Sequence, residues 1–229
     1  MRVKLILMEP KYQVNLGYVA RTAMNFGVDR LYLVNPRAKR SGEKARMYSK
    51  HAYKLLETAK VYKSLDEAAR DCDVLVGTTG IRRKAKANFK RIYFAEEAVE
   101  RLRRMKANAT VGLLIGRDDI GLTSREIERC DMLAYIGTNP EYPVLNISHA
   151  IAIFLYLLKR KELRAYHESG MRQEKPDPKE MGKLLALFER MIGGKKMRNR
   201  KAVLGAFRRM LRNSQPTKLE LHALITALK

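Results

Sequence analysis

The sequence predicts an α/β protein, in which a largely parallel sheet carries helices on both faces and is followed by a small all-helical extension. Through the first 165 residues, short apolar runs alternate with segments of helical periodicity, an order typical of parallel sheets. Near Tyr166 the chain becomes polar, with Gly and Pro, and no strand pattern follows. We therefore expect an α/β domain at residues 1–165, a linker at 166–177 and a basic helical C-terminal extension at 178–229.

Strands are expected where apolar residues run together, because a strand buried on both faces is apolar throughout. These runs lie at 3–8, 31–35, 61–62, 74–77, 111–115 and 133–136. Helices are expected where apolar residues recur every three or four positions. These segments lie at 14–26, 47–58, 65–70, 96–106, 124–129 and 146–163.

The C-terminal extension is expected to form three helices, at 178–192, 198–211 and 216–228. Asp177 is a good N-cap ahead of Pro178 at the first helical position. Thr217 and Glu220 have the spacing of a capping box. From residue 170 onward there are 15 Lys and Arg against 5 Asp and Glu, so this part is strongly basic.

The whole chain is also basic, with 47 Lys and Arg against 24 Asp and Glu and a net charge of +23. Such an unbalanced charge indicates a polyanionic partner, with nucleic acid ahead of an acidic membrane. The alternative, a surface rich in ion pairs, would be balanced in sign. The longest apolar stretch, 150–158, is far below the roughly 20 residues that span a bilayer. We expect a cytoplasmic protein without a membrane segment.

Several common kinds of site are absent from the sequence. Cys72 and Cys130 are far apart, and no pair has the spacing of a metal site, so we expect neither a metal nor a disulfide framework. There is no GxGxxG after a strand and no P-loop. Gly77-Thr78-Thr79-Gly80 follows a strand and could let a backbone loop approach a nucleoside closely, although a plain turn is the alternative.

Three segments lie where an apolar run gives way to a loop or a helix, which is where α/β proteins place ligand chemistry. They are Asn-Leu-Gly-Tyr-Val-Ala-Arg at 15–21, Gly-Arg-Asp-Asp-Ile-Gly-Leu at 116–122 and Asn-Pro-Glu-Tyr-Pro-Val-Leu-Asn-Ile-Ser at 139–148. Together they resemble the three signature motifs of the SPOUT class of RNA methyltransferases. Within that class the chain is most similar to archaeal-type tRNA ribose 2′-O-methyltransferases that modify nucleotide 32 of the anticodon loop.

The resemblance implies a trefoil-knotted α/β domain, a homodimer, a tRNA substrate with cytidine as the favoured base, and S-adenosylmethionine as the methyl donor. Carried over by position, the cofactor-binding residues are Thr78, Thr79, Gly80, Gly116, Ile136, Pro143, Val144 and Leu145. Two positions depart from the family. Asp118 stands where Glu is usual, and Val144 replaces a small polar residue common in bacterial members.

Arg21 and Asn15 are the expected catalytic residues. We expect the helix to begin near Asn15, so that Arg21 lies close to its start, where a guanidinium suits a phosphate or a forming oxyanion. From the residues alone, a surface arginine is the alternative. The resemblance implies that the arginine of the first motif is essential.

Basic residues are the expected RNA-binding surface, because the basic runs hold few acids to oppose them. The candidates are Arg82, Arg83, Lys84, Arg117, Lys195, Lys196, Arg198 and Arg200. Two other functions stay open: a ribosomal-RNA 2′-O-methyltransferase of the same class, and a non-catalytic RNA-binding protein built on a methyltransferase core.

Overall fold

The computed structural model describes residues 1–80, 91–170, 178–214 and 216–229. They form two compact units, Met1–Leu163 and Arg164–Lys229. Helix α8 (Ile147–Gly170) begins in the first unit and ends in the second. The linker was therefore expected too early, since 166–170 are helical; its remaining residues, including the expected cap Asp177, lie outside the described part.

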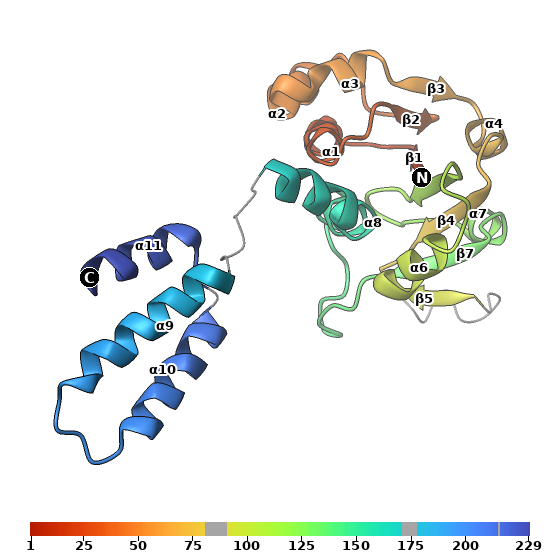
Figure 1. Cartoon of the computed structure of the whole chain (residues 1–229). Coiled ribbons are helices and arrows are strands. Elements are labelled where there is room, and N and C mark those ends of the chain that lie inside the picture. Colours follow the sequence, from red (N-terminus) through yellow and green to blue (C-terminus); the bar gives the residue numbers. More distant parts are fainter. Residues whose placement is uncertain (81–90, 171–177, 215) are drawn as a thin grey trace. The chain divides into compact units, whose positions relative to one another are not determined.

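The first unit is built on a seven-stranded sheet in which every pairing is parallel, as predicted (Figure 1). The strand order is β3-β2-β1-β6-β4-β7-β5. The strands are β1 (Arg2–Met8), β2 (Leu31–Val34), β3 (Lys60–Tyr62), β4 (Val74–Thr78), β5 (Ile92–Phe94), β6 (Thr110–Ile115) and β7 (Met132–Tyr135). Strand β5 was not predicted, because an edge strand of three residues is too short to show a period.

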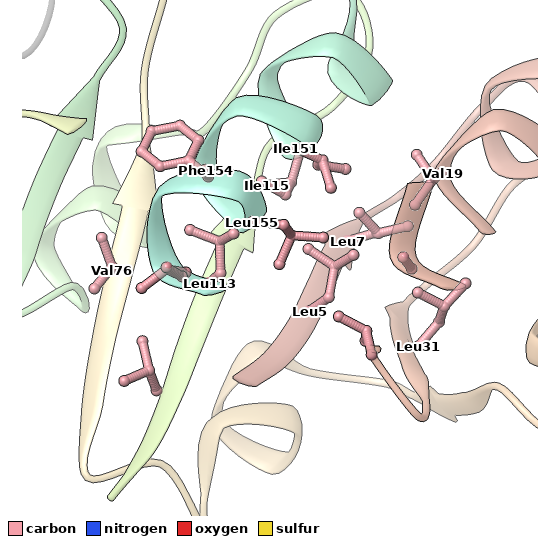
Figure 2. Close-up of a cluster of buried hydrophobic side chains, with 14 of the residues drawn as sticks. Leu5, Leu7, Val19, Leu31, Val76, Leu113, Ile115, Ile151, Phe154 and Leu155 are labelled. Carbon is pink, nitrogen blue, oxygen red and sulfur yellow. The ribbon is translucent and has the colours of Figure 1, made fainter. Parts of the chain in front are cut away.

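Strand β1 lies near the centre of the sheet and contributes to the core on both faces. Leu5 and Leu7 belong to one hydrophobic cluster, which Figure 2 shows, whereas Ile6 and Met8 belong to a second cluster. Successive side chains of a strand point to opposite faces, so a run of apolar residues fills both cores. Leu5, Ile6 and Leu7 are at most 1% exposed.

Helices cover both faces of the sheet. They are α1 (Gln13–Asn25), α2 (Glu43–Ser49), α3 (Tyr53–Glu57), α4 (Leu65–Ala69), α6 (Ala95–Leu102) and α7 (Ser124–Glu128), with a short 3₁₀ turn at Lys50–Ala52. Residues of α1, α6 and α8 pack in the first cluster, and residues of α4 and α7 pack in the second. The single helix expected at 47–58 is wrong: helix begins at Glu43 and is interrupted at Lys50, whose φ is +50°.

The second unit has its own small core. Helices α9 (Pro178–Gly193), α10 (Arg200–Ser214) and α11 (Lys218–Ala227) each contribute one fully buried leucine, namely Leu184, Leu211 and Leu221. The rings of Phe188 and Phe207 stack with their centroids 3.8 Å apart. The capping box of Thr217 and Glu220 is present at the start of α11, as predicted.

Candidate functional site

A pocket of about 220 Å³ lies at the carboxyl ends of the central strands. Strands β4, β6 and β7 run out into the loops that form it, and α8 closes one side. All eight residues predicted to bind the cofactor line this pocket: Thr78, Thr79, Gly80, Gly116, Ile136, Pro143, Val144 and Leu145. The structure thus brings together three segments that are far apart in the sequence.

The pocket also has an apolar wall that was not predicted. It includes Ile115 and Leu122 from around the second motif, Ile127 of α7 and Phe154 of α8. Phe154 is 3% exposed and belongs to the core, so its place in the wall follows from packing of α8 on the sheet. No motif marks it, and only its spacing from Ile147 and Ala150 on one face of α8 could have indicated it.

The loop at 116–122 closes on itself. The backbones of Arg117 and Gly121 exchange two hydrogen bonds of 3.1 Å, and Gly121 has φ +71°, a conformation that glycine adopts readily. A Cβ at position 116 would collide with the backbone of Gly121 and Leu122. Gly116 is therefore required for the tight turn that forms one wall of the pocket.

Side-chain hydrogen bonds join the three motif segments in one chain. Asn146 Nδ2 donates to Asn15 Oδ1 (3.1 Å), and Asn15 Nδ2 donates to Asp118 Oδ1 (2.5 Å). The other carboxylate oxygen of Asp118 accepts the backbone N–H of Lys11 (2.9 Å). Asn146 Oδ1 in turn accepts the N–H and hydroxyl of Ser148 at 2.9 and 2.8 Å. The carboxylate of Asp118 is thus long enough to reach both partners, although the family usually has Glu here.

Asn15 does not cap the helix, contrary to our expectation. Helix α1 begins at Gln13 with Tyr12 at the N-cap, and the Asn15 amide is used to link the loops instead. Arg21 is therefore eight residues beyond the helix start, or about 12 Å along the axis. Contrary to our expectation, Arg21 therefore lies outside the field of the helix N-terminus, which extends over only the first turn.

Arg21 is exposed and does not line the pocket. Within the part of the chain that the structure describes, its side chain makes no hydrogen bond and no ion pair. Of the two predicted catalytic residues, the structure therefore places only Asn15 in the hydrogen-bond network beside the pocket.

Arg117 was predicted to bind RNA, and the structure places it in an internal ion pair. Its guanidinium donates two bonds to the Glu126 carboxylate (2.9 and 3.0 Å) and one to Glu9 (2.5 Å). The side chain is only 13% exposed. Hydrogen bonds from Arg117, and then from Arg37, lower the pKa of Glu9, while Glu126 and Glu9 raise the pKa of Arg117. Because two carboxylates already engage three of its N–H groups, Arg117 braces the loop, and its side chain is poorly placed to contact phosphate.

The structure describes four of the seven remaining RNA-binding candidates. Arg82, Arg83 and Lys84 are outside the described residues. The others are exposed and lie together, between α9 and α10 and at the first residue of α10: Lys195, Lys196, Arg198 and Arg200. Arg200 also donates to the backbone oxygen of Glu189 (3.2 Å), which holds it at the end of α9.

The described part of the chain contains neither a candidate metal site nor a candidate membrane helix. Among residues 1–80, 91–170, 178–214 and 216–229, no group of three or more His, Cys, Asp or Glu is placed to hold a metal ion. No helix in the described ranges has the length and apolar character needed to cross a membrane.

Fold and site together define an α/β protein that binds a ligand over the carboxyl ends of its central parallel strands. The chain belongs to the SpoU rRNA Methylase family, whose sequence profile matches residues 2–156. The family expected from the three motifs is thereby confirmed.

Two archaeal relatives are similar to the chain. It is 36% identical over 192 residues to the tRNA (cytidine-2′-O-)-methyltransferase TrmJ of Methanocaldococcus jannaschii, covering 83% of this chain and 81% of that protein. It is 37% identical over 160 residues to the protein of the same name from Sulfolobus acidocaldarius, covering 70% of this chain and 66% of that protein.

Solved structures share the fold. TrmJ from Z. mobilis ZM4 aligns with a TM-score of 0.73 at 23% identity, over 100% of this chain and 98% of that one. The SpoU methyltransferase AviRb from Streptomyces viridochromogenes, in complex with AdoMet, aligns with a TM-score of 0.55 at 21% identity, over 71% of this chain and 61% of that one.

Proposed function

We propose that the protein transfers a methyl group from S-adenosylmethionine to the 2′-oxygen of a tRNA ribose, at nucleotide 32 of the anticodon loop, with cytidine as the favoured base. The observation that carries this proposal is the hydrogen-bonded chain Asn146–Asn15–Asp118, which ties all three motif segments together beside the pocket. The names of the archaeal relatives support tRNA and cytidine as the substrate.

The pocket fits the proposed methyl donor. Ile115, Leu122 and Phe154 offer an apolar wall for an adenine ring, and the loops at 78–80 and 143–145 offer backbone groups. Asp118 and Asp119 line the same pocket and suit a ligand that carries positive charge. When bound, S-adenosylmethionine supplies an electrophilic methyl group on a positively charged sulfur. The chain's own task is then to hold a ribose hydroxyl in line with that methyl group and to exclude water.

Arg21 is proposed to hold the RNA and to stabilise the charge that forms on the 2′-oxygen. A guanidinium keeps its proton in proteins, so Arg21 is not the base. It can donate charge-assisted hydrogen bonds to a neighbouring phosphate and to the forming alkoxide. The proton leaves to phosphate or to water. The exposure of Arg21 and its lack of internal partners in the described residues support this role.

We further propose that the working unit is a two-fold symmetric homodimer formed through α1 and α8. Both helices pack on the same face of the sheet, in the first hydrophobic cluster. Both also expose large apolar side chains: Tyr18 (39%), Met24 (52%), Ile153 (36%) and Tyr156 (54%). Pairing of these faces would cover them and bring Arg21 toward the pocket of the other copy, which explains why Arg21 does not line its own.

Two more features belong to the proposal. The first is the trefoil knot that the family resemblance implies for residues 1–165. We also propose that the basic helical extension binds tRNA, with Lys195, Lys196, Arg198 and Arg200 as phosphate contacts, because these residues are exposed and clustered.

The test is methyl transfer with a labelled donor to purified tRNA and, separately, to ribosomal RNA, followed by mapping of the modified nucleoside. We expect a 2′-O-methylcytidine at tRNA position 32. Label in ribosomal RNA alone would favour the alternative suggested by the family's description. Absence of transfer to any RNA would favour a non-catalytic RNA-binding protein.

The role of Arg21 is tested with Arg21→Ala and, as a matched control, Arg104→Ala, which removes another exposed arginine. Arg21→Ala should lower turnover by orders of magnitude without lowering the melting temperature, whereas the control should keep wild-type turnover. A mixture of Arg21→Ala and Gly116→Ala subunits should regain activity if the site is shared. A protein that sediments as a monomer and is fully active would refute the proposed dimer.

A further inference from the structure

We propose that a groove between α9 and α11 binds an unpaired segment of RNA. This α9/α11 groove has a volume of about 600 Å³ and lies wholly within the second unit. Glu180, Lys183, Leu187 and Arg190 line it along one face of α9, opposite His222 and Ile225 of α11. The inference rests on the proposed function, because it specifies where the RNA substrate touches this unit.

The charges of the groove favour a polyanion. Lys183 and Arg190 are exposed, and within the described residues neither makes a hydrogen bond or an ion pair with its side chain. They are seven residues apart on one helix face, which separates them by about 10 Å along the axis. Two unpaired cations at this separation can contact different phosphates of one strand.

The floor of the groove favours unpaired nucleotides. Leu187 and Ile225 are aliphatic and partly buried, so they present an apolar surface between the cations. A double helix offers sugar and phosphate to a protein surface, whereas an unpaired nucleotide can lay the face of its base against apolar side chains.

One end of the groove carries a carboxylate with an unused oxygen. Glu180 Oε1 lies 2.7 Å from His222 Nε2, while Oε2 is buried and, among the described residues, is the one buried side-chain oxygen or nitrogen without a partner. Such an atom calls for a donor. The last torsion of a glutamate is broad, so a turn of the carboxylate can bring this oxygen to the groove in exchange for Oε1, which then leaves His222. There it can accept the amino group of cytosine or adenine, while its charge keeps phosphate away.

The first experiment compares two double charge reversals in the full-length protein. Lys183→Glu with Arg190→Glu changes the groove, and Arg208→Glu with Arg212→Glu makes the same change at exposed positions of α10 that do not line it. For a tRNA transcript, the groove variant should raise Kd at least tenfold and flatten the salt dependence of log K by about 1.4, at about 0.7 for each of two phosphates. The α10 variant should change Kd less than threefold. Equal weakening by both variants would overturn the proposal.

The second experiment tests base recognition with short oligo(C), oligo(A) and oligo(U). The wild type should bind the first two more tightly than oligo(U), and Glu180→Gln should reduce this preference. Equal binding of all three by the wild type would overturn the role of Glu180.

Methyl transfer to tRNA separates this inference from the proposed function. The groove variant should keep wild-type turnover at saturating tRNA and show a raised KM. A wild type that methylates no RNA, with a groove variant that still loses tRNA affinity, would refute the proposed function and leave the groove standing. If the groove substitutions instead converted a dimer into monomers, the groove would be a contact between subunits, and the inference would be refuted.

Discussion

Replacing Asp118 by asparagine should disconnect the three loops around the pocket. The substitution keeps the size of the side chain but leaves one oxygen and one NH₂ group facing two donors, Asn15 Nδ2 and the N–H of Lys11. One of the two hydrogen bonds must be lost. Asn15 cannot compensate by turning its amide, because its oxygen would then no longer accept from Asn146.

The size of the effect follows from the bonds involved. A hydrogen bond to a charged group contributes about 1.5–3 kcal/mol, so Asp118→Asn should cost about 2 kcal/mol. For a unit the size of Met1–Leu163 this corresponds to a fall in Tm of about 4–8 °C. Since the loop lines the pocket, the same free energy could weaken S-adenosylmethionine binding by up to about 30-fold.

Calorimetry measures both quantities, as Tm in a thermal scan and as Kd by titration with S-adenosylmethionine. The matched control is Asp66→Asn, which removes an exposed ion pair with Arg129 away from the pocket and should leave Tm and Kd unchanged. If Asp118→Asn kept wild-type Tm and wild-type Kd, the hydrogen-bonded chain would not hold the loops together, and the reasoning would be refuted.

Three further substitutions or treatments have definite expected outcomes. Gly116→Ala should abolish cofactor binding and lower Tm, because the new Cβ would collide with the backbone. Gly80→Ala should keep the wild-type Tm, since its Cβ would be 3.6 Å from its nearest neighbour. Equal effects of the two variants in a thermal scan would contradict this prediction. Glu9 has a lowered pKa, so its stabilising effect is present above its unfolded pKa and is lost as pH falls through the folded value. The stability difference between wild type and Glu9→Gln, measured by urea unfolding, should therefore shrink below about pH 4.5, and a difference constant down to pH 3 would refute the assignment. Burial raises the pKa of Cys130 to about 12, so iodoacetamide at pH 8 should label it only after denaturation, as read by mass spectrometry; rapid labelling of the native protein would contradict the structure.

The position of the pocket could be predicted from the sequence, and the bonds that shape it could not. Thr78, Gly116 and Ile136 each follow a run of apolar residues, and parallel strands end at one edge of a sheet, so local pattern and motif together were enough. The partners of Asn15 lie 103 and 131 residues away, and no local period indicates a contact across such a distance.

The ion-pair partners of Arg117 could not be predicted from the sequence either. It stands in a basic chain, next to residues of a motif, and composition alone made it a candidate for phosphate. Its carboxylate partners come from positions 9 and 126, and only the fold brings them together. Arg21 is a further case, because the resemblance singled it out, whereas the helix start at Gln13 leaves it beyond the first turn of α1.

The hydrogen bond between Asn15 and Asn146 can form only after both residues have been synthesised. The two residues are separated by 131 positions, and ribosomes add about 5–20 residues per second, so the second amide follows the first by roughly 7–26 s. Strand β1 likewise waits for β6, its neighbour in the sheet, which begins only at Thr110. During this interval the apolar strand β1 lacks one of its two neighbours and has an unpaired edge. The nascent chain is therefore prone to aggregation until the last loop of the pocket has been synthesised.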